Sequence, residues 1–435
     1  MIIIIGAGIS GLSLAYFLEK QNKPYVLLEF KENEGQPGGV IRSVRDKEYL
    51  FELGPNSLLI DQEIKDFLIE LGIEKELINA NNVSKNRYVF RNGRYQKLPS
   101  SPLSLLFNGF FSWKTKFKIF GESRVQSKTN DKETLAAFFE RRFSKEIVDY
   151  ALDPFVSGIY AGNPQELLVK YTFPNLVEME QKYGSLLKGF KKNKNTTERK
   201  QIVSFREGMQ TIPRAIAEKV KITYLEKGIE EISFNGRVWE VKSEENSFVA
   251  PKLVFTGAAY QLAPLVAKSE VAFSKALEKV NYAPIAAVHT LYYKKELKVK
   301  MDGFGALHPS VENLFSLGHI WSSSVFEHRC KDNEVLFTTF VGGSRGADKL
   351  KMDDWQVMAK VQKEIKELYG IDTLPITQKI TRWHKGIPQY DTSILEAYEH
   401  LEKLEKKQFY LCANWKDGVS LPDSIKKAKK LAEIL

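Results

Sequence analysis

Apolar and polar positions at the start of this chain follow the order strand, helix, strand. The unbroken apolar run Ile2–Ile5 predicts a buried parallel strand, and apolar positions at helical spacing follow it over residues 12–18. A second apolar run, Tyr25–Leu28, ends at Glu29. Between the first strand and the helix the chain reads Gly6-Ala7-Gly8-Ile9-Ser10-Gly11. Glycines here allow a tight turn and close approach to a pyrophosphate, and the acid suits a ribose, so the pattern predicts adenine-dinucleotide binding.

A second glycine turn follows the ribose acid and favours FAD over a nicotinamide cofactor. Gly38 and Gly39 precede Arg42, whose forked guanidinium suits a phosphate. This stretch resembles the GG-x-x-R segment with which FAD-dependent oxidases and desaturases cross the pyrophosphate. Because the spacing from Glu29 to Gly38 is longer than is usual in that group, we expect residues 31–36 to form a solvent-exposed insertion.

Helical and strand-like patterns continue along the rest of the chain. Apolar spacing after Asp61 predicts a helix that stops at Gly72, and residues 86–98 read as a hairpin. From residue 99 to about 194 helical spacing dominates. The strands expected after it are 202–205, 222–225, 236–241, 252–257 and 409–414, with a last helix from about Ser420.

This order of elements predicts an α/β fold with three parts. They are a discontinuous, Rossmann-like FAD-binding domain, a mixed-sheet substrate domain and a helical, membrane-facing insertion. The FAD-binding domain is expected over 1–75, 199–268 and 385–435. The substrate domain is expected over 76–98 and 269–384, and the insertion over 99–198.

Composition argues against several kinds of chemistry. The 435 residues are 43% hydrophobic, which is enough for more than one core. The two cysteines, Cys330 and Cys412, form no disulfide framework, and the six histidines show no metal-ligand spacing, so we expect a reducing cytoplasm and no metal site. No signal peptide is expected, because the first strand begins at residue 2. No catalytic triad or carboxylate pair supports hydrolysis.

Two basic stretches suggest an anionic partner. The net charge is +10, and lysines and arginines gather over 188–200, where a solvated loop is the alternative; no nucleic-acid motif accompanies them. Over 101–118, large apolar residues alternate with lysines without reaching the ~20 residues that a spanning helix needs. We expect peripheral contact with the cytoplasmic face of a membrane through Phe110, Phe111 and Trp113. Aromatics that line an internal tunnel or core are the alternative.

Longer motifs make the chain resemble the protoporphyrinogen oxidase family, the oxygen-dependent flavoenzymes of haem synthesis. The resemblance covers essentially the whole length and separates the chain from amine oxidases and carotene desaturases. The most specific motifs are DPFVSGIYAGNP at 153–164, SFREGMQTIP at 204–213, TTFVGGS at 338–344, IPQY at 387–390 and NWKDGVSLPD at 414–423.

The resemblance implies a non-covalent FAD and further residues that hold it. Besides the two glycine turns, these are Gly54, Pro55, Asn56, Ile229, Thr256, Gly257, Asp417, Gly418 and Val419. Ile229 corresponds to the adenine end, and the backbone N–H groups of Gly418 and Val419 correspond to the pyrimidine end of the flavin. A helix N-terminus at that end supports the negative charge of a reduced flavin.

On the substrate side the resemblance implies Asn56 and three further residues. Arg87 matches an arginine that pairs with a propionate, and Asn56 matches an asparagine near the reacting ring. A solvated strand arginine and a turn-forming asparagine are the alternatives. Leu307 and Phe326 match apolar residues that sandwich the macrocycle, with ordinary core packing as the alternative. Glu327 stands where the family has proline.

The function implied is FAD-dependent oxidation of protoporphyrinogen IX to protoporphyrin IX, with O₂ as acceptor and H₂O₂ as product. Oxidation of coproporphyrinogen III is the first alternative. An amine oxidase, a carotenoid desaturase and a non-catalytic flavoprotein are the others. The partners implied are a porphyrinogen and O₂, and a homodimer is left open.

Overall fold

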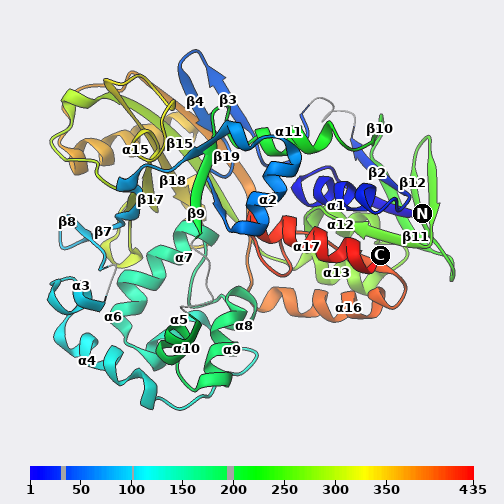
Figure 1. The fold of residues 1–435 in the computed structure, drawn as a ribbon, viewed down its shortest axis with the longest axis horizontal. Helices are drawn as coiled ribbons and strands as arrows, with labels where there is room; N and C mark the ends of the chain where they lie inside the picture. The colour runs from blue at the N-terminus through cyan, green and yellow to red at the C-terminus, as the bar shows by residue number, and fades with distance from the viewer. Residues whose placement is uncertain (31–35, 100–101, 194–199) are drawn as a thin grey trace.

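The computed structural model describes residues 1–30, 36–99, 102–193 and 200–435, and it places them in three regions (Figure 1). A parallel sheet wrapped in helices lies at the right of the view, a large mixed sheet at the upper left and a group of helices at the lower left. Most of the expected insertion at 31–36 lies outside the described residues, as do Ser101, Lys194 and Arg199.

The parallel sheet is assembled from distant parts of the chain. Its strands lie in the order β10, β2, β1, β14, β20, and every neighbouring pair is parallel. The bounds are β1 Ile2–Ile5, β2 Tyr25–Phe30, β10 Ile222–Leu225, β14 Lys252–Phe255 and β20 Phe409–Leu411. All four side chains of β1 are buried, as a strand covered on both faces requires.

Six helices surround this sheet. They are α1 Ile9–Lys20, α11 Thr211–Ala217, α12 Ala259–Leu265, α13 Val271–Glu278, α16 Leu395–Glu405 and α17 Leu421–Ile434. Helix α17 begins beside Ser420 as expected, and Ser420 caps it, since its hydroxyl accepts a hydrogen bond from the Asp423 N–H. Helix α1 packs against both α11 and α17, so the two ends of the chain share one core.

The large sheet has seven strands in the order β19, β15, β18, β17, β16, β7, β8, and only the β16–β7 pair is parallel among them. The bounds are β7 Tyr88–Arg91, β8 Arg94–Lys97, β15 Tyr282–Tyr293, β16 Gly305–Leu307, β17 Gly318–Trp321, β18 Glu334–Gly342 and β19 Thr377–Pro388. Helix α15, Asp354–Tyr369, covers one face through Val357, Val361 and Ile365. The predicted hairpin is confirmed as β7–β8, with Asn92 and Gly93 both at positive φ in its turn.

Smaller sheets and two helices connect these regions. The strands are β3 Ser43–Asp46, β4 Tyr49–Glu52, β5 Leu58–Ile60, β6 Leu77–Asn79, β9 Gln201–Phe205, β11 Ile229–Phe234, β12 Trp239–Ser243 and β13 Ser247–Ala250. The helices are α2 Gln62–Leu71 and α14 Ser322–Val325. The predicted α2 is confirmed with its Asp61 cap and Gly72 stop, whereas the strand expected from Gly236 begins only at Trp239.

The helical region spans the sequence between β8 and β9. Its helices are α3 Pro102–Phe107, α4 Trp113–Gly121, α5 Leu135–Arg142, α6 Lys145–Ile147, α7 Asp153–Tyr160, α8 Val169–Thr172, α9 Pro174–Tyr183 and α10 Leu186–Asn193. The fold class is thus the one expected. The parallel sheet takes strands from all three segments expected for the FAD-binding domain, while β19 crosses the expected boundary at 384/385; the domain bounds themselves stay a prediction.

A buried ion network ties the helical region together. The Arg142 side chain is fully buried and pairs with Glu122 and Glu180, whose side chains are also fully buried. Glu122 accepts a further hydrogen bond from the Leu186 N–H at 2.9 Å, which joins α10 to the network. Burial alone would raise the pKa of Glu122, but the hydrogen bonds from Ser185, Leu186 and Arg142 outweigh it and lower that pKa.

The aromatics expected to contact a membrane fall into two groups. Phe110 is 1% exposed and Phe111 is also buried, and both pack with Val89 of the seven-stranded sheet, so their expected membrane contact is wrong. Trp113 is 63% exposed and Phe117 is 72% exposed on the outer face of α4. Among the described residues, no helix is both long and apolar enough to cross a membrane.

Candidate active site

Three glycine-containing turns meet beyond the carboxyl end of β1. The Gly38 N–H donates to the Ala7 carbonyl at 3.1 Å, which brings the second turn against the first. A Cβ at Gly54 would lie 2.1 Å from the Val40 carbonyl oxygen, so the third turn touches the second. A Cβ at Gly11 would lie 1.9 Å from the Gly6 oxygen, and therefore only glycine lets α1 start this close to β1.

Two features of these turns fit the pyrophosphate of a dinucleotide. A Cβ at Gly8 would meet no atom within 4 Å, so the backbone before α1 faces open space. The Arg42 Nε is buried and has no hydrogen-bond partner among the described residues. An unpaired buried guanidinium N–H is costly unless an anion accepts from it. The predicted glycine turns and Arg42 are therefore brought together in a place that suits FAD.

Glu29 lies at the same turn, as its spacing predicted. Its carboxylate accepts hydrogen bonds from the Ala7 N–H at 2.6 Å and the Phe30 N–H at 2.9 Å. On the neighbouring strand, Tyr224 stands in register with Glu29. Tyr224 and Pro37 belong to the lining of a surface groove of about 380 Å³ beside β10.

Other residues that were expected to contact the cofactor lie next to these turns or in neighbouring strands. The Thr256 hydroxyl lies 2.8 Å from the Ile5 oxygen and 2.9 Å from the Gly6 oxygen, so it ties β14 to the first turn. The Gly257 carbonyl accepts from the Trp415 indole N–H at 3.2 Å. Ile229 is buried in the first strand of a separate antiparallel sheet. Their contacts with FAD stay a prediction.

The loop before α17 has an unusual backbone and a partly buried lysine beneath it. Asp417 and Gly418 both have positive φ, and the Gly418 N–H donates to the Tyr390 hydroxyl at 3.1 Å. The Val419 N–H is therefore the donor on which the expected flavin contact still depends. The Lys427 ammonium donates to the Ala413 carbonyl at 2.6 Å and to the Gly418 carbonyl at 3.2 Å. Burial lowers the pKa of Lys427.

Sequence reasoning missed Lys427 because one lysine of a basic helix cannot be distinguished from its exposed neighbours by pattern alone. Cys412 is a buried, free thiol, and burial raises its pKa to about 11, so little thiolate forms near neutral pH.

The expected substrate residues come from separate elements. The Arg87 guanidinium stacks on the Phe304 ring, 4.2 Å from its centroid, and donates to the Ser84 carbonyl; burial lowers its pKa. Leu307 pairs in register with Val89, so the hairpin that carries Arg87 lies next to the strand that carries Leu307.

Asn56 and Phe326 differ from these in their surroundings. The Asn56 amide donates to the Gly54 carbonyl at 3.3 Å, a contact typical of a turn. Phe326 follows α14, is only 3% exposed and lies 5.2 Å beneath the Arg329 guanidinium. Phe326 therefore offers little surface to a macrocycle in this conformation.

A buried pair that sequence reasoning missed joins the glycine turns to the substrate side. Glu52 accepts hydrogen bonds from the Ser43 hydroxyl at 2.6 Å and the Met209 N–H at 3.0 Å, and its Oε1 lies 3.6 Å from the Arg329 Nη2. Burial raises the pKa of Glu52 more than Arg329 lowers it. Residues at 43, 52, 209 and 329 meet only in the fold, so no local motif could have signalled the contact.

Comparison with known proteins gives the class to which this fold and site belong. The profile of the family described as flavin-containing amine oxidoreductase matches residues 9–435, and the chain belongs to that family. It is a flavoprotein oxidoreductase, and FAD, the expected cofactor, is confirmed.

Several individual relatives are named as porphyrinogen oxidases. Protoporphyrinogen oxidase 2 of Arabidopsis thaliana is 28% identical over 99% of this chain and 93% of its own length. Coproporphyrinogen III oxidase of Bacillus subtilis is 26% identical over 98% of this chain and 96% of its own length. A crystal structure from Exiguobacterium, provisionally assigned as a protoporphyrinogen oxidase, superposes with a TM-score of 0.82 at 21% identity, covering 100% of this chain and 98% of that one. The resemblance stated from the motifs is thus confirmed.

Proposed function

We propose that this chain oxidises protoporphyrinogen IX to protoporphyrin IX, with O₂ as acceptor and H₂O₂ as product. The observation that carries the proposal is the meeting of two glycine turns beside Arg42, whose buried Nε has no partner in the described part of the chain. The chain also resembles named porphyrinogen oxidases along its whole length. When bound, FAD would supply a two-electron acceptor, so the six-electron oxidation would take three rounds, each delivering two electrons to one O₂ to give one H₂O₂.

The protein's own part in this reaction is to bind and orient. Arg87 is a stacked, half-buried guanidinium, which suits a carboxylate of the substrate. Leu307 lies on the adjacent strand and supplies apolar surface. No strong base is assigned, because pyrrole N–H protons can leave to solvent as the ring is oxidised. The Lys427 charge lies below the loop where a reduced flavin would carry negative charge.

The test is to supply the FAD-loaded enzyme with protoporphyrinogen IX in air and to follow porphyrin fluorescence and H₂O₂ together. We expect both to rise in proportion, well above the rate of spontaneous oxidation. Coproporphyrinogen III is measured in parallel, because the Bacillus subtilis relative carries that name. If kcat/KM is higher for coproporphyrinogen III, that compound is the substrate. If neither compound is oxidised, the proposed function is refuted.

We also propose that the chain contacts the cytoplasmic face of a membrane peripherally through α3 and α4. Phe107 is 85% exposed at the end of α3. On α4 the rings of Trp113 and Phe117 lie 6.4 Å apart, and Lys114 and Lys118 are exposed beside them. Exposed aromatics next to lysines favour the interface of an anionic bilayer.

A further inference from the structure

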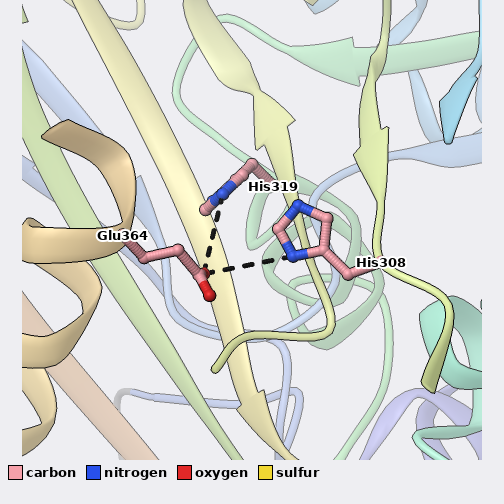
Figure 2. A group of neighbouring side chains, drawn as sticks. All are labelled: His308, His319 and Glu364. Atoms are coloured by element: carbon pink, nitrogen blue, oxygen red, sulfur yellow. Dashed lines mark ion pairs between the residues drawn. The ribbon is translucent and has the colours of Figure 1, made fainter. Parts of the chain in front are cut away.

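Three metal-ligating side chains meet in the core of the seven-stranded sheet, and the active site uses none of them (Figure 2). His308 directly follows β16, His319 lies on β17 and Glu364 on α15, and all three are buried. Glu364 Oε1 lies 4.0 Å from His308 Nδ1 and 4.0 Å from His319 Nε2. All three ligand atoms lie within 4.8 Å of one another, so they converge on one point.

One of these atoms is a buried nitrogen without a partner. His319 Nδ1 lies 2.8 Å from the Thr339 hydroxyl, which leaves Nε2 to face Glu364. That Nε2 has no hydrogen-bond partner within the described part of the chain. A buried polar atom that stays unpaired costs about 1–3 kcal/mol. A ligand that binds His319 Nε2 would remove this cost.

Further hydrogen bonds orient each of these side chains, as is usual for the ligands of metal sites. His308 Nε2 lies 3.1 Å from the Tyr95 hydroxyl. The Glu364 carboxylate accepts hydrogen bonds from the Phe315 and Ser316 N–H groups. His308 Nδ1 lies 3.2 Å from the Ser316 carbonyl oxygen and 3.0 Å from the Ser316 hydroxyl. An ion at Nδ1 would replace these contacts, and the hydroxyl offers an oxygen for a fourth position.

Glu364 supplies the negative charge of the cluster, and the nearby Lys349 ammonium partly offsets it. Lys349 donates to the Leu314 carbonyl at 3.2 Å and the Phe315 carbonyl at 2.7 Å rather than to Glu364, so it does not occupy the carboxylate. A buried carboxylate between two imidazoles is stabilised by a divalent ion that all three can bind.

We propose that His308, His319 and Glu364 bind one zinc ion. Zinc lies about 2.0–2.2 Å from nitrogen and oxygen ligands, so tetrahedral ligand atoms are roughly 3.4 Å apart. Each 4.0 Å pair would need to close by about 0.6 Å, and the two histidine nitrogens, which lie within 4.8 Å of each other, by up to about 1.4 Å. The ion would fasten β16 and β17 to α15 and so fix the strand that carries Leu307. The site lies apart from the cofactor turns and does not depend on the proposed substrate.

The spacing of the histidines in the sequence could not predict this site. His308 and His319 are 11 positions apart (319 − 308), and Glu364 follows 45 positions later (364 − 319). Because β16, β17 and α15 bring them together only on folding, no short-range ligand spacing exists.

The test measures metal and FAD per chain in holoenzyme produced in zinc-supplemented medium and passed through a chelator. We expect about one zinc per chain in the wild type. His319→Gln and Glu364→Gln are expected to lose at least ten-fold of it. His289→Gln is the matched control, because His289 is equally buried on β15 of the same sheet and lies outside the cluster; it is expected to keep its zinc.

X-ray absorption at the zinc edge of the wild type keeps the test decisive if the variants do not fold. We expect two imidazole nitrogens and one or two oxygens around the ion. Less than about 0.1 metal per wild-type chain, an unchanged zinc content in both ligand variants, or a zinc shell without imidazole would overturn the proposal.

Discussion

The cofactor side and the substrate side of this molecule are built in different ways. On the cofactor side, backbone atoms make the decisive contacts, as where Gly38 meets Ala7 and where Gly11 lets a helix begin against Gly6. In the helical region and the seven-stranded sheet, on the other side of the molecule, buried polar side chains do so, as in the Arg142 network and the His308 cluster. Backbone contacts demand a particular residue at a particular spacing, whereas side-chain clusters can be gathered from anywhere in the chain.

The largest expected effect concerns the ion network of the helical region. Glu122→Ala leaves Arg142 buried beside one carboxylate fewer, and we expect the free energy of unfolding to fall by about 3–5 kcal/mol. Denaturant titration followed by circular dichroism measures this change. Glu140→Ala is the control, since Glu140 is exposed on α5 and should change stability by less than about 0.5 kcal/mol. Equal losses in both variants would mean that the network contributes nothing specific.

The same network predicts a dependence on acid. The pKa values of Glu122 and Glu180 are lower in the folded chain than their usual value of 4.5. Their stabilisation is therefore complete above about pH 4.5 and is lost as the pH falls through the folded values. Thermal unfolding measured from pH 7 to pH 3 should show Tm falling steeply below pH 4.5, and Glu122→Gln should make that fall shallower. If the Tm of Glu122→Gln fell with pH as steeply as that of the wild type, the network would not be the cause of the acid dependence.

On the cofactor side, two neighbouring glycines should respond differently to alanine. Gly11→Ala forces a Cβ against the Gly6 oxygen, so we expect stability to fall by about 1–3 kcal/mol or more and FAD to be lost. Gly8→Ala meets no protein atom, so the apoprotein should keep its Tm while FAD affinity falls at least ten-fold. Calorimetry of the apoprotein and FAD titration separate the two effects. Full FAD affinity in Gly8→Ala would place the pyrophosphate elsewhere.

Substrate binding should depend on Arg87 more than on its neighbours in the hairpin. A charged hydrogen bond contributes about 1.5–3 kcal/mol, so Arg87→Ala should raise KM for the porphyrinogen by roughly 10- to 150-fold. Arg87→Lys should restore part of the loss, because lysine keeps the charge without the fork. Arg94→Ala on the adjacent strand is the exposed control. Unchanged kinetics in Arg87→Ala would remove it from the substrate site.

The smallest effect is expected at the outer face of α4. Trp113→Ser with Phe117→Ser should weaken binding to anionic vesicles about ten-fold, since the two exposed rings together contribute on the order of 1.4 kcal/mol at the interface. Vesicle co-sedimentation measures it. Phe155→Ser is the control, because Phe155 is an exposed aromatic on α7, away from α3 and α4. If the control weakened binding equally, the contact would lie elsewhere.

The difference between local backbone contacts and long-range side-chain clusters also determines how much of the molecule could be predicted. The first strand, the glycine turns and Glu29 were predictable, because a strand–glycine–helix unit is local and its spacing is dictated by backbone geometry. Phe110 and Trp113 were not separable in sequence, since both are large aromatics and only the packing on Val89 buries one of them.

Two kinds of contact lay beyond any local pattern. The Glu52–Arg329 pair and the His308–His319–Glu364 cluster each join segments far apart in the chain. Lys427 is one lysine among several in α17, and its hydrogen bonds to the Ala413 and Gly418 carbonyls distinguish it. In each case the informative property is the surroundings of the side chain, which the fold creates.

Anaerobic stopped-flow absorbance tests the proposed oxidation most directly. The FAD-loaded chain is mixed without oxygen with protoporphyrinogen IX and, separately, with coproporphyrinogen III. Rapid loss of the oxidised flavin band, faster with protoporphyrinogen IX and restored when O₂ is admitted, is the predicted result. A flavin band that neither porphyrinogen bleaches would contradict porphyrinogen oxidation and return the search to amines, carotenoids or a non-catalytic role.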